Sequence, residues 1–242
     1  MKPPSIALVT IGQTPRDDLA APILAELPTG VRARQYGLLD GLSPKEAAER
    51  FAPRGHGIPL VTLLAGGREI LIDAHAAGDA LQELIGRLED SGVDTMVTLC
   101  TGTFEDVRPG RVNLVQPDKV IPGEVARVAG GRRVGVLVPS PRQLEWPELK
   151  WAALAQEPVY AAASPYGDRG AVSAAARSLV ERGAEVLVLD CMGYGAGHRE
   201  AAAAATGVTV LASSEILARS LRLGGTWLPM TAGQTGAALS SQ

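Results

Sequence analysis

Two stretches of the sequence, GVDTMVTLCTG at residues 92–102 and GAEVLVLDCMG at residues 183–193, align with each other without a gap. Each starts with a glycine that suits the end of a helix, continues through an acidic residue and an apolar run, and ends in cysteine, any residue and glycine. A short apolar run bounded in this way is typical of a buried strand. The repeat therefore predicts two related halves, each with a strand that ends at a cysteine: Cys100 in the first half and Cys191 in the second.

The repeat extends toward the start of each half, where IALVTIG at residues 6–12 aligns with VGVLVPS at residues 134–140. In the rest of the chain, β-branched apolar runs alternate with segments of helical spacing, which is typical of βαβ units and parallel sheets. We expect strands at residues 5–11, 31–37, 95–99, 112–116, 133–138, 159–163, 185–189 and 208–212. We expect helices at residues 17–26, 74–91, 122–129, 141–156, 168–182 and 213–223, and a capped helix start at residues 43–46.

One segment breaks this alternation and makes the first half longer than the second. Two apolar runs flank Gly66 and Gly67, a pattern that predicts an antiparallel hairpin near residues 59–73. The domain prediction assigns residues 1–118 and 206–225 to the first lobe and residues 119–205 to the second. Residues 226–242 are rich in glycine, threonine and serine, so we expect a flexible tail there.

Composition excludes several classes of function. The chain has 242 residues, of which 46% are hydrophobic and 20% charged, so it can bury a sizeable core. A formal net charge of −3 provides no basic surface for nucleic acid. The apolar run at residues 6–12 is too short for a signal sequence or a membrane span, so we expect a cytoplasmic protein with reduced thiols. Neither cysteine has a partner at metal-ligand spacing, and we expect no metal site.

The position of the cysteines points to chemistry. In parallel α/β sheets ligands bind beyond the carboxyl ends of the strands, which is where Cys100 and Cys191 fall. A glycine two residues later allows close approach of the backbone, and the dipole of a following helix is expected to favour thiolate. The alternative is that each cysteine is a small buried hydrophobe, a common role for this residue. Equivalent placement in both halves favours the chemical role.

At this point the motifs resemble a known family. The sequences CTGT at residues 100–103 and CMGY at residues 191–194 resemble the two cysteine motifs of the aspartate/glutamate racemase superfamily. IALVTIGQTPRDDL, GLLDGLSPKEAAERFAPRG and VLDCMGY resemble its AroM branch. The resemblance implies an α/β fold of two pseudo-symmetric, Rossmann-like, three-layer lobes with mainly parallel sheets. It also implies an active site in the interlobe cleft, no cofactor and a homodimer.

In racemases of that superfamily, one cysteine removes a proton beside a carboxylate and the other returns a proton from the opposite face. The resemblance therefore implies that Cys100 and Cys191 are a catalytic acid/base pair. Amino-acid racemases there carry Asn after the first cysteine and Thr-His after the second, whereas this chain has Thr101 and Met192-Gly193. Those missing groups help to hold an α-amino group. Arg16, whose guanidinium suits a carboxylate, still favours a small anionic substrate.

Further candidates for substrate binding surround the cysteines and the first turn of each half. They are Gly12, Gln13, Thr14, Arg16, Thr101, Gly102, Thr103, Ser140, Met192, Gly193 and Tyr194. Several have structural alternatives: a surface position for Arg16, a helix N-cap for Ser140 and core packing for Tyr194. For His198, a solvent-facing position is preferred to a partnership with Cys191.

Three functions are compatible with this pattern. The first is a cofactor-independent racemase or isomerase that uses both cysteines for proton transfer next to a carboxylate. The second is an enzyme with one working cysteine, similar to maleate isomerases or arylmalonate decarboxylases. The third is a protein that binds a small ligand on the same scaffold without turnover.

Overall fold

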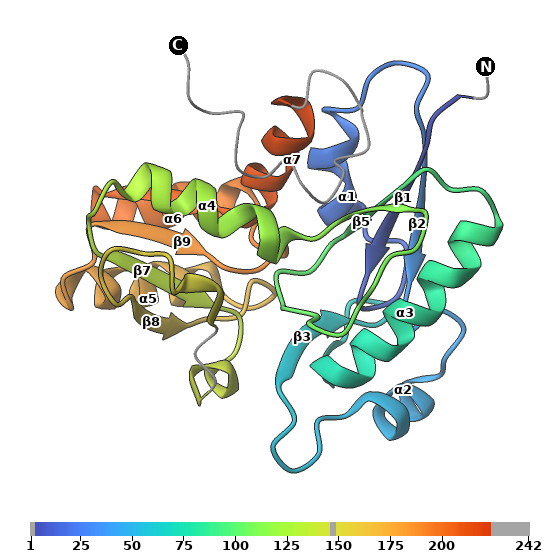
Figure 1. Ribbon diagram of the computed structural model, residues 1–242. Coiled ribbons are helices and arrows are strands. Elements are labelled where there is room, and N and C mark those ends of the chain that lie inside the picture. Colours follow the sequence, from blue (N-terminus) through green and yellow to red (C-terminus); the bar gives the residue numbers. More distant parts are fainter. Residues whose placement is uncertain (1–2, 146–148, 224–242) are drawn as a thin grey trace.

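Two four-stranded parallel sheets form the centres of two lobes (Figure 1). The computed structural model describes residues 3–145 and 149–223. The first sheet has the order β2 (Arg32–Gly37), β1 (Ser5–Thr10), β5 (Thr95–Thr98) and β6 (Asn113–Val115). The second has the matching order β8 (Val159–Ala162), β7 (Val134–Val138), β9 (Val186–Leu189) and β10 (Thr209–Ala212). The predicted two-lobed α/β fold with parallel sheets is therefore confirmed, and every predicted strand is present.

The internal repeat is exact in the strands that lead to the cysteines. Strand β5 begins three residues after Gly92 and ends two residues before Cys100, and β9 has the same spacings from Gly183 and to Cys191. Both strands lie inside their sheets, where β5 pairs with β1 and β9 pairs with β7. All four residues of β9 are buried, as are the last three of β5. Burial on both faces explains the continuous apolar runs.

The prediction that residues 206–225 belong to the first lobe is wrong for β10, which pairs with β9 in the second sheet. The reason is the repeat itself, since β10 occupies the position that β6 has in the first sheet. Helix α7 (Ser213–Leu223) then packs back on helix α1 (Asp17–Leu24) of the first lobe. Helix α4 (Pro117–Ala129), which follows β6, packs into the core of the second lobe. The lobes thus exchange one helix each.

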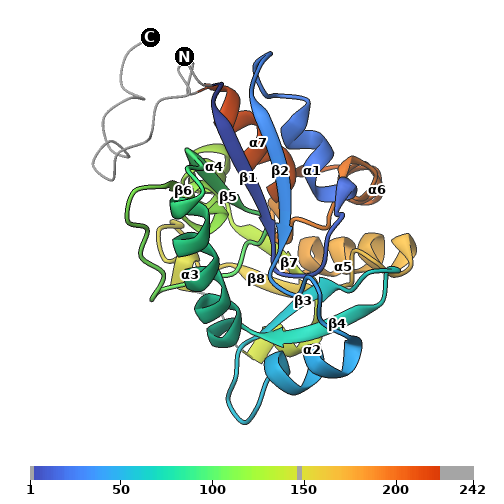
Figure 2. The same ribbon diagram turned by 90° about the vertical axis from the view of Figure 1, so that its right-hand side faces the viewer.

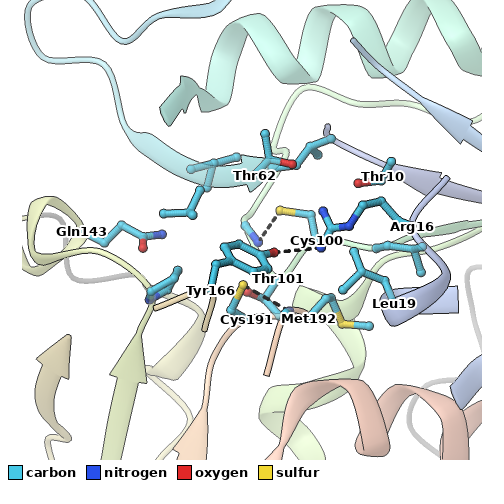
Figure 3. A pocket seen from close by; sticks show the side chains of 17 residues that line it. Thr10, Arg16, Leu19, Thr62, Cys100, Thr101, Gln143, Tyr166, Cys191 and Met192 are labelled. Atoms are coloured by element: carbon cyan, nitrogen blue, oxygen red, sulfur yellow. Dashed lines mark hydrogen bonds between the residues drawn. The ribbon is translucent and has the colours of Figure 1, made fainter. Parts of the chain in front are cut away.

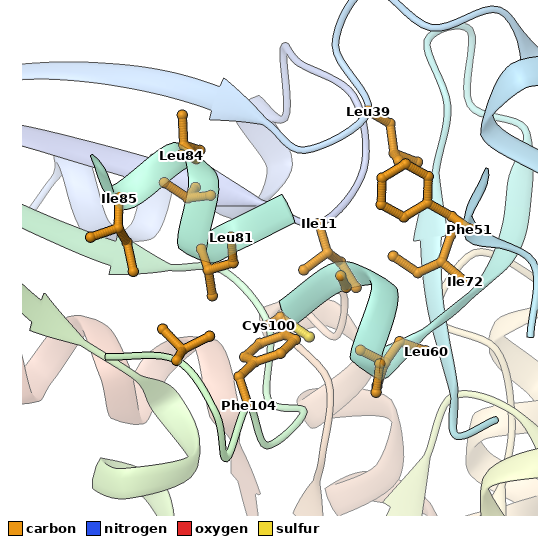
Figure 4. Packing of buried hydrophobic residues seen from close by; sticks show 14 of the residues in the cluster. Ile11, Leu39, Phe51, Leu60, Ile72, Leu81, Leu84, Ile85, Cys100 and Phe104 are labelled. Carbon is orange, nitrogen blue, oxygen red and sulfur yellow. The ribbon is translucent and has the colours of Figure 1, made fainter. Parts of the chain in front are cut away.

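The antiparallel hairpin is present as β3 (Pro59–Leu63) and β4 (Glu69–Asp73), and Gly66 and Gly67 supply positive φ angles of 84° and 82° in its turn. It lies with helix α2 (Pro44–Phe51) at one end of the first lobe (Figure 2). Helix α3 (Ala74–Asp90) follows directly. Figure 4 shows the core that these elements share, in which Leu60 of β3 and Leu81 of α3 pack near Cys100.

Helices α5 (Arg169–Glu181) and α6 (Ala196–Thr206) cover the second sheet (Figure 1). The predicted helix at residues 141–156 is wrong: the described residues there form short 3-10 turns at Pro141–Glu145 and Leu149–Trp151. A continuous α-helix would need an amide N–H from Pro147, which proline lacks. The predicted helix at residues 122–129 begins earlier, at Pro117, since proline suits the first helical turn. The predicted flexible tail at residues 226–242 lies outside the described residues.

None of the helices in the described part of the chain is long and apolar enough to cross a membrane.

Candidate functional site

One pocket brings the two cysteine segments together at the junction of the lobes (Figure 3). Cys100 and Cys191 both line it, each from the loop that follows its strand. The predicted site residues Arg16, Thr101, Gly102, Met192 and Gly193 line it as well. The other lining residues are Thr10, Ile11, Leu19, Leu60, Val61, Thr62, Leu99, Pro139, Gln143 and Tyr166. The pocket is partly open to solvent, and the space in it for the centres of water-sized molecules is about 20 Å³.

The two cysteine loops repeat the same local geometry. The backbone N–H of Gly102 donates to Cys100 Sγ at 3.3 Å, and that of Gly193 donates to Cys191 Sγ at 3.4 Å. Both glycines are needed for close packing, because a Cβ on Gly102 would lie 2.7 Å from Leu60 Cδ2 and one on Gly193 would lie 2.7 Å from Tyr166 Oη. An N–H directed at sulfur favours the thiolate. The sequence repeat is therefore also a repeat of hydrogen bonds.

The surroundings of the two sulfur atoms nevertheless differ. Cys100 packs against the apolar core of the first lobe, near Phe104 (Figure 4). Cys191 keeps partial solvent contact, yet burial raises the pKa of its thiol to about 11. The Gly193 N–H opposes this rise in pKa, whereas the neighbouring Asp190 carboxylate adds to it. Cys191 is therefore a thiol at neutral pH, and its chemical capacity is to donate a proton.

The expected helix-dipole effect on the thiols is not found. Cys100 is followed by loop and turn up to residue 112, and α6 begins only at Ala196, five residues after Cys191. A helix dipole acts mainly within the first turn, so at Cys191 burial outweighs it. Each thiol instead has the N–H of its own glycine.

A buried ion pair joins the cysteine segments across the lobes. Lys150 Nζ lies 2.8 Å from Asp190 Oδ2 and donates to the carbonyl oxygen of Thr101 at 2.7 Å. The side chains of Lys150 and Asp190 are only 5% and 3% exposed. The Thr101 hydroxyl also donates to the carbonyl oxygen of Asp190, at 3.2 Å. The residues adjoining the two cysteines are thus bonded to each other, and Lys150 compensates the charge beside Cys191.

Arg16 is buried at the pocket, so the surface alternative for it is wrong. Its Nε and Nη2 donate to both oxygens of Asp18, at 2.9 and 2.8 Å, and Nη2 also donates to Tyr166 Oη at 2.9 Å. Burial works against the charge, but the hydrogen bonds with Asp18 and Tyr166 raise the pKa of Arg16 overall. The guanidinium is therefore held as a fixed positive charge.

Tyr166 closes the pocket from the second lobe, and Figure 3 shows its ring between the two cysteines in that view. Its loop is tied to the hairpin, because the Ser164 hydroxyl donates to Glu69 of β4 and accepts from the Tyr166 N–H at 3.1 Å. Burial, together with the proximity of Cys191, raises the pKa of the Tyr166 hydroxyl. It remains a neutral donor at physiological pH.

The loop after β1, which holds Gly12, Gln13 and Thr14, mainly stabilises the fold through hydrogen bonds and packing. Gln13 Nε2 donates to the carbonyl oxygens of Leu39 and Leu42, its Oε1 accepts from the Ala65 N–H, and Thr14 donates to Asp40. A Cβ on Gly12 would lie 2.3 Å from Thr62 Oγ1, so Gly12 lets the hairpin approach. Among the described residues these three are not in the pocket lining.

In the second half, Ser140 and Tyr194 have the structural roles that the sequence offered as alternatives to substrate binding: a helix N-cap and core packing. Ser140 Oγ accepts from the Arg142 N–H at 3.3 Å, as an N-cap does. Tyr194 is fully buried and donates to the Ala163 carbonyl. His198 is partly exposed: its Nδ1 accepts from the Gly195 N–H at 3.2 Å, and its ring lies 5.7 Å from that of Tyr194. Thr103 also lies outside the pocket lining.

Several residues of the pocket and of the ion pair beside it carried no clear signal in the sequence. Thr62 and Leu60 come from the hairpin, whose place over the cysteines depends on tertiary packing. Lys150 lies in a stretch with an incorrect helix prediction. Tyr166 could have been flagged, because it follows the carboxyl end of β8, next to β7 in the same sheet.

Comparisons with known proteins agree with this architecture. The model of a family described as AroM protein matches residues 6–222. Allantoin racemase from Pseudomonas fluorescens is similar in structure, with a TM-score of 0.57, 19% identity and 98% of both chains covered. Picrophilus torridus aspartate racemase has a TM-score of 0.58 at 13% identity, covering 92% of this chain and 94% of that one.

An arylmalonate decarboxylase has a TM-score of 0.56 at 16% identity, again covering 92% of this chain and 94% of that one. Comparison with curated proteins finds no match. At these identities the structural likeness establishes the fold, and the family model covers most of the chain. The chain therefore belongs to the AroM protein family and has the two-lobed fold of the aspartate/glutamate racemase superfamily.

Proposed function

We propose that this protein is a cofactor-independent racemase- or isomerase-like enzyme that transfers protons next to the carboxylate of a small acid. The observation that carries the proposal is the placement of Cys100 and Cys191, from equivalent strand ends of two lobes, in one pocket. Inversion at carbon requires an acid and a base on opposite faces of the substrate. Two lobes with one cysteine each are suited to that arrangement.

The different surroundings of the thiols suggest a role for each in one direction of the reaction. In this direction the reaction needs Cys100 to enter as the thiolate: it takes the proton from the carbon, and the electron pair moves onto the carbonyl oxygen. Cys191, which is a thiol at neutral pH, gives its proton to the opposite face and becomes the thiolate. The reverse turnover restores both groups. The Gly102 N–H at Cys100 Sγ supports the first step by stabilising the thiolate.

Negative charge on the intermediate needs donors in the pocket. Arg16 and the Tyr166 hydroxyl are the strongest, since one is a fixed cation and the other a neutral donor. A well-placed donor of this kind contributes about 3 kcal/mol to transition-state stabilisation. The Thr101 hydroxyl is a weaker candidate than the sequence indicates, because its single proton is already donated to Asp190.

The test is solvent deuterium incorporation at the α carbon of small acids, read by NMR, with wild type and the variants Cys100→Ser and Cys191→Ser. Both variants are expected to lose inversion while retaining the circular dichroism spectrum and melting temperature of wild type within a few degrees. Thr98→Ser, in strand β5 ahead of Cys100, is the matched control and is expected to retain inversion. Inversion that survives in either cysteine variant would refute the two-base mechanism.

A second candidate function uses Cys191 alone as a proton donor. The raised pKa of Cys191 favours it, because a donor must carry its proton before the reaction. In that case Cys100→Ser retains protonation of a carbanion formed by loss of another group, and only Cys191→Ser is inactive. A mass adduct trapped on one cysteine would favour a covalent isomerase. Saturable thermal stabilisation by a metabolite, with no exchange and no product, would favour a binding protein.

A further inference from the structure

We propose that the pocket takes a small carbonyl compound whose α carbon carries no protonated amine, such as a 2-hydroxy acid or a cyclic amide. The inference names a substrate class and rests on the proposed proton-transfer function. It departs from the aspartate racemase to which the fold is similar. The charges around the pocket are the basis for it.

Among the described residues, the pocket lining offers an ammonium group no carboxylate. Of the described residues that line it, Arg16 is the one cationic side chain, and none is Asp or Glu. A substrate ammonium group would therefore sit near a fixed positive charge without a carboxylate. Burial of a charged group without a partner is strongly unfavourable, so such a substrate binds poorly.

Two described carboxylates next to the lining, those of Asp18 and Asp190, are already engaged. Both oxygens of Asp18 accept hydrogen bonds from Arg16. Asp190 is 3% exposed and lies 2.8 Å from Lys150 Nζ. Binding an ammonium group to Asp18 would break its bidentate ion pair, and binding it to Asp190 would break its buried ion pair. The free energy lost in either case exceeds the free energy gained from the new contact.

Apart from Arg16, the described lining side chains that carry oxygen or nitrogen are uncharged. They are the hydroxyls of Thr10, Thr62, Thr101 and Tyr166 and the amide of Gln143, set among apolar side chains such as Ile11 and Leu60. Hydroxyl and amide groups recognise a substrate hydroxyl, carbonyl or amide through hydrogen bonds. Arg16, with part of its charge offset by Asp18, can still accept one carboxylate or a developing enolate.

The experiment compares matched pairs of compounds that differ at the α substituent. The pairs are lactate with alanine and malate with aspartate, and hydantoin is added as the cyclic amide. Each compound is first tested for protection of Cys191 against iodoacetamide above pH 9, where the thiol becomes reactive, followed by mass spectrometry. We expect lactate and malate to protect at concentrations at least about 10-fold lower than alanine and aspartate, respectively, because each amino acid would bury one unpaired charged group. Hydantoin is likewise expected to protect at least about 10-fold better than either amino acid. The same panel is then incubated in deuterium oxide and followed by NMR.

The outcomes separate this inference from the proposed function. Protection and exchange by a compound without an amine support both. Protection without exchange supports the substrate class and refutes the proton-transfer function. Stronger protection or faster exchange with alanine or aspartate overturns the substrate class and leaves the function standing. Protection by none of the amine-free compounds also overturns the substrate class.

Discussion

Replacement of Lys150 by methionine tests the buried ion pair that joins the cysteine segments. Methionine keeps the length of the side chain but removes the charge that lies 2.8 Å from Asp190 Oδ2. Asp190, 3% exposed, is then left as an uncompensated carboxylate, and the carbonyl of Thr101 loses its donor. Removing one partner of a buried pair costs about 3 to 5 kcal/mol of unfolding free energy. In a chain of this size, a loss of about 3 kcal/mol corresponds to a melting temperature lower by about 6 to 12 °C.

The assay is urea unfolding at pH 7, followed by circular dichroism, with thermal melting as a second measurement. Arg111→Met is the matched control, because Arg111 pairs with Asp90 on the surface, where the two side chains are 74% and 83% exposed. Its expected cost is below about 0.5 kcal/mol. The double variant Lys150→Met/Asp190→Asn removes the orphaned charge and should recover much of the loss. The reasoning is refuted if Lys150→Met costs no more than the control.

Three further predictions concern the pocket itself. Because the pKa of Cys191 is about 11, its alkylation by iodoacetamide should rise steeply only above pH 9; a midpoint near pH 8.5 in a pH series would contradict the burial argument. The raised pKa also means that the fold stabilises the thiol of Cys191 over its thiolate. The contribution of Cys191 to the free energy of unfolding is therefore present below pH 9 and is lost as the pH rises toward 11. Urea unfolding across that pH range measures it. Gly193→Ala should lower the free energy of unfolding by about 1 to 3 kcal/mol, because the new Cβ would meet Tyr166 Oη and Pro165. Gly123→Ala, in open space on α4, is the control and should not destabilise the protein. Equal effects of the two substitutions would argue against the close approach at Gly193.

Much of the fold could be predicted from local patterns. The apolar runs, the turn glycines at Gly66 and Gly67 and the duplicated strand-to-cysteine segments each depend on neighbours in the chain, and all are present in the structure. The assignment of β10 to the first lobe was wrong because the sequence of a single strand does not determine which sheet the strand joins. The fourth position of the second sheet follows only when the repeat is applied to complete sheets.

The candidate site was only partly predictable for the same reason. The repeat indicated that Cys100 and Cys191 are equivalent, and the structure places both at one pocket. It could not indicate that Gln13 ties the opening loop to the scaffold or that Tyr166 closes the pocket. Those roles depend on which distant segments pack together.

The sequence by itself determined two related α/β halves, the strands that carry the cysteines and the glycine that follows each one, since these follow from periodicity and backbone chemistry along the chain. Tertiary structure alone decided the chemical state of the site. Burial and the Asp190 carboxylate raise the pKa of Cys191, and the charge of Asp190 is balanced by Lys150, 40 residues away in the chain. Electrostatic energies depend on the distances between charged groups and on their desolvation, and neither can be obtained from the order of the residues along the chain.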